Sequence, residues 1–356
     1  MTSFPTSLAE ALDLHIPNEK QCSVNLSTDI AFGGVSSGGY IACVMAKYAT
    51  LYASKHPKLN KQSDVRSSTV IFYRPVVPTK SAVMVLREVS IGKAWSTLRV
   101  EISQGDKIAA SSDITITSFS VPGVTLQTGW NLFPPPRQVD LLKLEEGEDP
   151  AWTSYQTAFY PDGFRRGHSY IRNFIPKTWS TDSSFVEQWI LPGWDCEPLG
   201  SCAKPENEKA LWTNDMIQFI VDNGLPVQEN YMPRVPGKPL PMGSVAATLA
   251  FAAEQEKARN EGNAQWRALS DDGSKEIMVQ TVHVTLSMST EIKKNLPREG
   301  VRWLYLRTEA KHIENGRMDL EILLYDEKME LVAINNQVAQ IIPATGKNKK
   351  GNDARL

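Results

Sequence analysis

Three amide side chains interrupt an apolar segment near the end of the chain. Residues 331–341, LVAINNQVAQI, carry the Leu, Val and Ile residues of a buried β-strand, yet Asn335, Asn336 and Gln337 lie in the middle of it. Successive side chains of a strand point to opposite faces, so Asn335 and Gln337 share one face. An amide can hold a water molecule by hydrogen bonds, which makes Gln337 a candidate site residue; a wet sheet surface is the alternative.

A second strand-like segment carries hydroxyl groups and a histidine on one face. In TVHVTLSMST, side-chain alternation places five polar residues together: Thr281, His283, Thr285, Ser287 and Ser289. A polar face on an antiparallel strand usually faces solvent. His283 can act as a base if this face borders a cleft, and a surface or hydrogen-bonded histidine is the alternative.

Two glycine pairs, Gly33-Gly34 and Gly38-Gly39, precede a predicted helix in the sequence FGGVSSGGYIA. Glycine lets a backbone approach a ligand closely, and N–H groups at a helix start bind a negatively charged oxygen, so these four residues are candidate substrate-binding residues. The stretch lacks the Lys-Ser/Thr ending of a phosphate loop and the spacing of a dinucleotide site. The sequence also lacks a His-Glu-x-x-His motif, and we predict no metal or redox cofactor.

Composition excludes several classes of protein. A net charge of -2 without a basic stripe predicts no binding to nucleic acid, and no uninterrupted apolar run approaches the ~18 residues of a membrane span. The first residues lack the features of a secretory signal. The four cysteines are too few and scattered for a disulfide framework, so free thiols are expected: Cys22, Cys43, Cys196 and Cys202.

The last three residues, Ala354-Arg355-Leu356, have the small-basic-leucine pattern of the peroxisomal address Ser-Lys-Leu. They end a polar, basic segment that is not predicted to fold. We therefore predict a peroxisomal location, with a cytoplasmic one as the alternative.

The elements that position these residues follow one order twice. A strand at 20–28 leads into a buried helix with Ile41, Val44 and Met45 on one face, and strand-like runs follow at 68–77, 82–92, 94–103 and 107–119. The second set begins with strands at 169–176 and 183–192. It continues with helical segments at 207–223 and 245–262 and with strands at 279–292, 300–313, 316–326 and 330–342.

This order predicts an internal repeat of two α+β units. Gly92 and Ala109 in the first unit have the same separation as Gly316 and Ala333 in the second, and in that register Asp113 falls opposite Gln337. We predict a first unit at 1–129, a connection at 130–165 that adds no core, a second unit at 166–345, and a disordered tail at 346–356.

The repeat and three of its segments resemble the double hot-dog acyl-CoA thioesterases, and most nearly a fungal thioesterase-like branch related to bacterial acyl-CoA thioesterase II. The segments are FGGVSSGGYIA, VIFYRPV and LPREGVRWLYLRTEAKHIENGRMDLEILLYDEKMELVAINNQ. The resemblance covers about 20 to 343. It implies a tandem hot-dog fold, in which each antiparallel sheet wraps around a central helix.

The resemblance also implies a site. The bacterial relatives hydrolyse fatty acyl-CoA with an Asp, a Ser or Thr, and a Gln that orient and activate a water molecule. Asp215 matches the Asp and Gln337 the Gln. Thr281 is the ungapped match for the hydroxyl, with Thr285 and Ser287 left open on the same strand face. After the Gln this chain has Val-Ala where the bacterial enzymes have Glu-Gly.

Two functions follow as predictions. The first is hydrolysis of an acyl-CoA or related acyl thioester, which places the protein in lipid or secondary metabolism. The second is a non-hydrolytic hot-dog protein that binds or shapes an acyl or polyketide intermediate. Two units in one chain already form a pair, so a monomer and a homo-oligomer are both compatible with the sequence.

Overall fold

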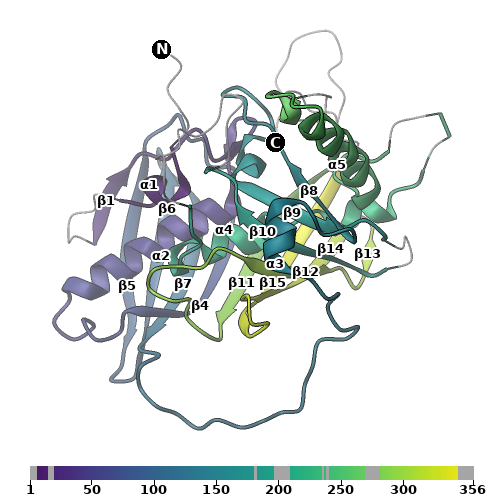
Figure 1. Ribbon diagram of the computed structural model, residues 1–356. Helices are drawn as coiled ribbons and strands as arrows, with labels where there is room; N and C mark the ends of the chain where they lie inside the picture. Colours follow the sequence, from purple (N-terminus) through teal and green to yellow (C-terminus); the bar gives the residue numbers. More distant parts are fainter. Residues whose placement is uncertain are drawn as a thin grey trace.

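The computed structural model describes residues 6–14, 20–179, 183–195, 209–234, 236–237, 240–268 and 281–343. Within them one antiparallel sheet of thirteen strands runs through the molecule (Figure 1). In spatial order its strands are β1 (Gln21–Val24), β5 (Ala82–Ile91), β6 (Trp95–Gln104), β7 (Lys107–Thr117), β4 (Asp64–Phe72), β11 (Thr281–Ile292), β15 (Leu331–Pro343), β14 (Arg317–Tyr325), β12 (Leu304–Glu309), β10 (Phe185–Pro192), β9 (Ile171–Pro176) and β8 (Trp152–Gln156), with β13 (Ile313–Glu314) paired to β14.

The strand order repeats about the β4–β11 junction. Reading outward from it, β4, β7, β6 and β5 on one side correspond to β11, β15, β14 and β12 on the other. This is the order expected for a duplicated unit. The join is a regular antiparallel pairing in which Thr69 lies opposite Ser289, so the two halves share one continuous sheet.

Each half packs a helix on the inner face of the sheet. Helix α2 (Gly38–Lys55) lies against β4, β6 and β7, and Ala and Cys residues let it be buried on most sides, as predicted. In the second half the predicted helix at 207–223 is much shorter. Within the described part of that range, residues 209–223, only α4 (Ile217–Asp222) is α-helical, preceded by the 3-10 turn η2 (Asn214–Met216), because Trp212 instead forms a β-bridge with Val301.

The remaining helices are short or peripheral. Helix α5 (Val245–Asn260) covers β8, with Ser244 capping its start through a bond from the N–H of Ala247. The others are α1 (Leu8–Ala11), α3 (Leu141–Glu146), η1 (Arg166–Tyr170), η3 (Val227–Tyr231) and η4 (Trp266–Ala268). A separate hairpin joins β2 (Ala31–Phe32) to β3 (Val35–Ser36).

The predicted repeat register is wrong by one residue at its polar position. Asp113 lies on the outer face of β7 and forms a two-pronged ion pair with Arg99, whereas Gln337 faces inward on β15. Ser112, which precedes Asp113 in β7, is buried and faces inward, and its hydroxyl is hydrogen-bonded to the Ser68 hydroxyl. The β6–β7 and β14–β15 turns differ in length, and a shift of one residue moves every side chain to the other face.

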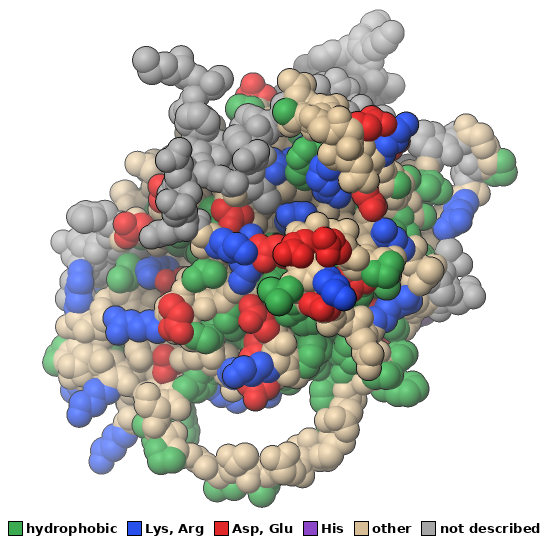
Figure 2. All heavy atoms as spheres, in the orientation of Figure 1, with side chains coloured by type: hydrophobic (Ala, Val, Ile, Leu, Met, Phe, Trp, Pro, Cys, Tyr) green, Lys and Arg blue, Asp and Glu red, His purple; other side chains and the backbone are tan. Residues whose placement is uncertain are grey.

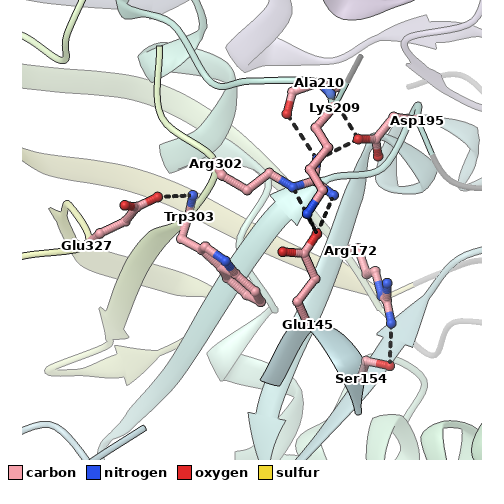
Figure 3. Close-up of polar contacts among 9 residues, drawn as sticks. All are labelled: Glu145, Ser154, Arg172, Asp195, Lys209, Ala210, Arg302, Trp303 and Glu327. Carbon is pink, nitrogen blue, oxygen red and sulfur yellow. Dashed lines mark hydrogen bonds and ion pairs between the residues drawn. The ribbon is translucent and has the colours of Figure 1, made fainter. Parts of the chain in front are cut away.

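The connection at 130–165 contributes a core of its own, contrary to expectation. Leu144 of α3 and Trp152 of β8 are buried with Trp189, Trp303 and Tyr305 on the outer face of the second half-sheet. Ion pairs hold α3 there: Arg302 contacts Glu145 at 3.2 Å and Asp195 at 2.5 Å, and Lys209 reaches the same Glu145 (Figure 3). The outer face of this half is therefore covered.

The segment between β7 and α3 stands clear of the body as an open loop (Figures 1 and 2). Apolar side chains along it are exposed: Val121, Val124, Leu126, Trp130 and Phe133. Where it rejoins the sheet, it lines a pocket of about 580 Å³ together with residues of β12 and β14.

Some of the residues named in the sequence predictions lie outside the part of the chain that the structure describes. Cys22 and Cys43 are both buried, while Cys196, Cys202 and the C-terminal Ala354-Arg355-Leu356 lie outside the described residues. In the part of the chain that is described, no helix is long and apolar enough to cross a membrane.

Candidate active site

The two central helices meet where α2 begins and α4 ends. A Cβ at Gly39 would lie 2.6 Å from the backbone oxygen of Gln218 and 2.6 Å from the Asp222 Cβ, so only glycine permits this approach. Further along the contact the Cys43 Sγ accepts a bond from the N–H of Phe219. The two helices thus run antiparallel, with the start of α2 against Asp222.

Asp222 is the last residue of α4, where the helix dipole disfavours a negative charge. The opposing start of α2 offsets this, because the Gly39 N–H donates to the Asp222 Oδ2 at 2.6 Å. The Ser37 hydroxyl and the Gln337 amide are also near enough for their hydrogen bonding to favour the ionised carboxylate and lower its pKa. Burial is the largest effect and raises the pKa of Asp222 to about 6, against the opposing effect of these bonds.

Gln337 is brought to Asp222 by its place on the inner face of β15, where it is 5% exposed. Its Nε2 also lies 3.5 Å from the Val221 carbonyl oxygen. The neighbouring inward amide has a different role: Asn335 donates to the Thr290 hydroxyl at 2.7 Å, and Thr290 donates to the Gln218 amide oxygen at 2.7 Å. Asn335 therefore ties the strand to α4.

Asp215 lies at the other end of the α4 segment. Its carboxylate pairs with Lys47 of α2 at 2.6 Å, and its side chain is 42% exposed. Seven residues of helix separate it from Asp222 by roughly 10 Å. The contacts of Gln337 go to Val221 and Asp222, so the structure does not bring Asp215 and Gln337 together. Asp222 could have been found from the sequence by its position, because an acidic residue at the C-terminal end of a helix is electrostatically unfavourable.

The predicted hydroxyls are divided by a bulge in β11. The register shifts between Thr285 and Ser287, so Thr281 and Thr285 face inward while Ser289 bonds Thr69 on the exposed face. The Cα partner of Gln337 on β11 is Met288, which has no hydroxyl. Thr281 pairs with Pro343, six residues or roughly 20 Å from Gln337, and it contacts Glu229 instead. Ser37 is the hydroxyl that the structure places at Asp222.

The four predicted glycines fall into two groups. Gly38 and Gly39 begin α2 beside Asp222, where Gly39 serves the carboxylate. Gly33 and Gly34 instead form the turn of the β2–β3 hairpin. Gly33 has φ +56° and donates to the Phe164 carbonyl oxygen. The first pair is thus a turn, and the second lies at the candidate site.

The sequence from Gly34 to Gly38 also fits the Gly-x-Ser-x-Gly spacing of a nucleophile elbow. The Ser36 Oγ at its centre is buried, and among the described residues it has no hydrogen-bond partner. No base is therefore placed to activate Ser36, and Asp222 is the acid–base group that the local geometry favours.

The arrangement suits activation of a water molecule. A carboxylate with a pKa near neutrality can accept a proton, an amide beside it can orient the water, and the start of α2 provides partial positive charge. The Asp222 side chain is half-buried, and burial is the largest cause of its raised pKa.

Comparison with known proteins agrees with the fold and its duplication. Residues 27–120 match the acyl-CoA thioesterase N-terminal domain, and residues 202–341 match the acyl-CoA thioesterase C-terminal domain. The thioesterase-like protein TwmA of Talaromyces wortmannii is 26% identical over 378 residues, covering 98% of this chain and 95% of TwmA.

Solved structures share the architecture at low sequence identity. A structure described as a thioesterase II from Thermobifida fusca has a TM-score of 0.60 at 13% identity, covering 94% of this chain and 98% of the other. A hot-dog protein from Alicyclobacillus acidocaldarius has a TM-score of 0.57 at 11% identity, with 95% and 98% covered. With both family domains matched in order and this architecture shared, the chain belongs to the acyl-CoA thioesterase family and is a thioesterase-like hydrolase with a double hot-dog fold.

Proposed function

We propose that this protein hydrolyses an acyl-CoA or a related acyl thioester, with a water molecule activated by Asp222. The observation that carries the proposal is the meeting of three elements at one carboxylate. The Gly39 N–H of the first half donates to Asp222, and Ser37 of the first half and Gln337 of the second both lower the pKa of the same carboxylate. Burying an ionisable acid costs free energy, and packing of the two halves does not by itself require a carboxyl group at this position.

In this mechanism Asp222 takes a proton from the water as its oxygen attacks the thioester carbonyl carbon. The negative charge that develops on the carbonyl oxygen is stabilised by the partial positive charge at the start of α2. The C–S bond then breaks, and the thiolate recovers the proton from Asp222. Gln337 orients the water, and Ser37 takes the role that the sequence suggested for Thr281.

Thiol release from a panel of acyl-CoA esters of increasing chain length tests the proposal. We expect turnover by the wild type and its loss in Gln337→Met, which keeps the strand but removes the amide. Asn336→Ala is the matched control, because Asn336 is the adjacent amide on the exposed face of β15. Equal turnover by wild type and Gln337→Met would exclude this mechanism.

One observation favours a second function, in which an acyl thioester is bound without hydrolysis. Met288 occupies the strand position beside Gln337, so β11 supplies no hydroxyl there. Binding of acyl-CoA by calorimetry, without thiol release from any ester of the panel, would support that function instead.

A further inference from the structure

A second group of polar side chains lines the same inner face of β11, beyond Asp222. Its six members are Arg165, His168, Gln228, Glu229, Thr281 and His283, and we refer to them as the polar group. They come from three separate segments: the start of η1, the turn η3, and β11. The proposed reaction does not use them.

The members of the polar group bond to one another. Gln228 Nε2 lies 2.8 Å from His283 Nδ1, and the Thr281 hydroxyl lies 3.4 Å from Glu229. The Arg165 guanidinium lies 3.0 Å from His168 Nδ1. Arg165 also lowers the pKa of both histidines, after the larger effect of burial, so both rings are neutral at physiological pH.

The polar group continues the surface on which Asp222 lies. His283 pairs with Ile341 on β15, four residues and roughly 13 Å along the strand from Gln337. Thr285 and Ala339 lie between these two levels on the same face. The chain itself leads there, since η3 begins five residues after Asp222.

Solvent reaches this surface although protein surrounds it. His283 is exposed, yet burial is the largest cause of its lowered pKa, and Asp222 shows the same combination of access and burial. A chain bound with its thioester at Asp222 would meet His283 if it extended along this face of the sheet.

One hydrogen-bond acceptor in the polar group, the side-chain oxygen of Gln228, is not satisfied by the described residues. Gln228 is 2% exposed, and within the described residues its side-chain oxygen has no hydrogen-bond partner. A buried acceptor without a donor costs about 1–3 kcal/mol. With Gln228 donating to Nδ1, the proton of the neutral His283 ring is on Nε2, which is then a second group able to donate. One donor and one acceptor are the complement of a hydroxyl group.

From these observations we infer that the polar group binds a hydroxyl on the acyl chain, so that the substrate is an oxygenated acyl thioester rather than a plain fatty acyl ester. The inference rests on the proposed function for the position of the thioester. An alkyl chain would desolvate these polar groups without satisfying them. A phosphate is disfavoured, because Glu229 is acidic, the histidines are neutral, and Arg165 already contacts His168.

The test compares lauroyl-CoA with its isomers hydroxylated at successive carbons from mid-chain to the chain end. For the wild type, kcat/KM for the best hydroxylated ester should exceed that for the plain ester. In His283→Leu and in Gln228→Met this ratio should fall by roughly 5- to 150-fold, the equivalent of one lost buried bond. Ser289→Ala, on the exposed face of β11, should keep the wild-type ratio, and thermal melting checks that each variant is folded.

Two results would overturn the inference. One is equal kcat/KM for plain and hydroxylated esters in the wild type. The other is a loss in His283→Leu that depends on the thiol, which replacing CoA by N-acetylcysteamine would reveal, because the polar group would then bind the pantetheine amides. If no ester is hydrolysed, the proposed function fails separately. Calorimetry with thioether analogues, hydroxylated and plain, then decides the inference by whether the hydroxyl raises affinity.

Discussion

Replacing Asp222 by Asn is the most direct test of which carboxylate does the chemistry. The change keeps the size of the side chain and leaves an oxygen to accept from the Gly39 N–H, but it removes the group that would take the proton. Loss of a general base typically lowers the rate by about 10²–10⁴-fold. Asp215→Asn is the matched control. It makes the same chemical change in the same helical segment, at the end that lies away from Gln337.

The pH dependence sharpens this prediction. Because Asp222 acts as a base only when ionised, wild-type kcat/KM should reach half its plateau near pH 6 and fall about tenfold per pH unit below that. Asp222→Asn should lose this dependence along with the rate. Asp215→Asn should keep the wild-type profile, because an exposed ion pair with Lys47 contributes at most about 1 kcal/mol, and only to stability.

The assay is thiol release under kcat/KM conditions from pH 5 to pH 8, with melting curves for all three proteins. If Asp215→Asn lost activity while Asp222→Asn kept it, the assignment from geometry would be refuted. A wild-type profile flat through pH 6 would also refute the role of Asp222 as the base.

Three further predictions concern stability. Gly39→Ala should destabilise by about 1–3 kcal/mol in urea unfolding, since its Cβ meets helix backbone at 2.6 Å, whereas Gly34→Ala, where a Cβ meets nothing within 4 Å, should change little. Equal effects of the two would contradict the close helix contact. Thr290→Val should cost about 1–3 kcal/mol in the same experiment, because it leaves the buried Asn335 amide without its acceptor. The pKa of Asp222 is about 6 in the folded protein, against an ordinary value of 3.8 for an aspartate, so the folded state holds the proton more tightly. Its contribution to stability is complete below pH 4 and lost as pH rises through 6, by at most about 3 kcal/mol. Asp222→Asn should lack this loss, and melting curves at pH 4.5 and pH 8 would show whether it does.

Local patterns were enough to predict much of the fold. Apolar runs predicted the strands around Gln337 and at 169–192, helical spacing predicted α2, and Ala/Glu-rich composition predicted α5. These patterns are readable because strand and helix periods depend only on nearby residues. The repeated order of elements, with the resemblance of three segments, also predicted the tandem hot-dog arrangement.

Tertiary structure alone decided which polar groups meet. The bulge in β11 separates Thr285 from Ser287, and one extra residue in a strand reverses its faces without any clear mark in the sequence. Periodicity likewise left 130–165 outside the core, because its short elements are stabilised by the outer face that they cover rather than by their own pattern.

The choice between Asp215 and Asp222 shows the same division. The sequence by itself determined that a short helix near 215–222 carries acidic residues and that Gln337 lies in an apolar strand. Which acid faces Gln337 was decided by the crossing of α2 and α4 at Gly39, since that contact lays the start of one helix on the end of the other. The residues that meet at Asp222 include Ser37 and Gln337, which lie far apart in the sequence. A contact across such a separation depends on the packing of both halves rather than on any local spacing.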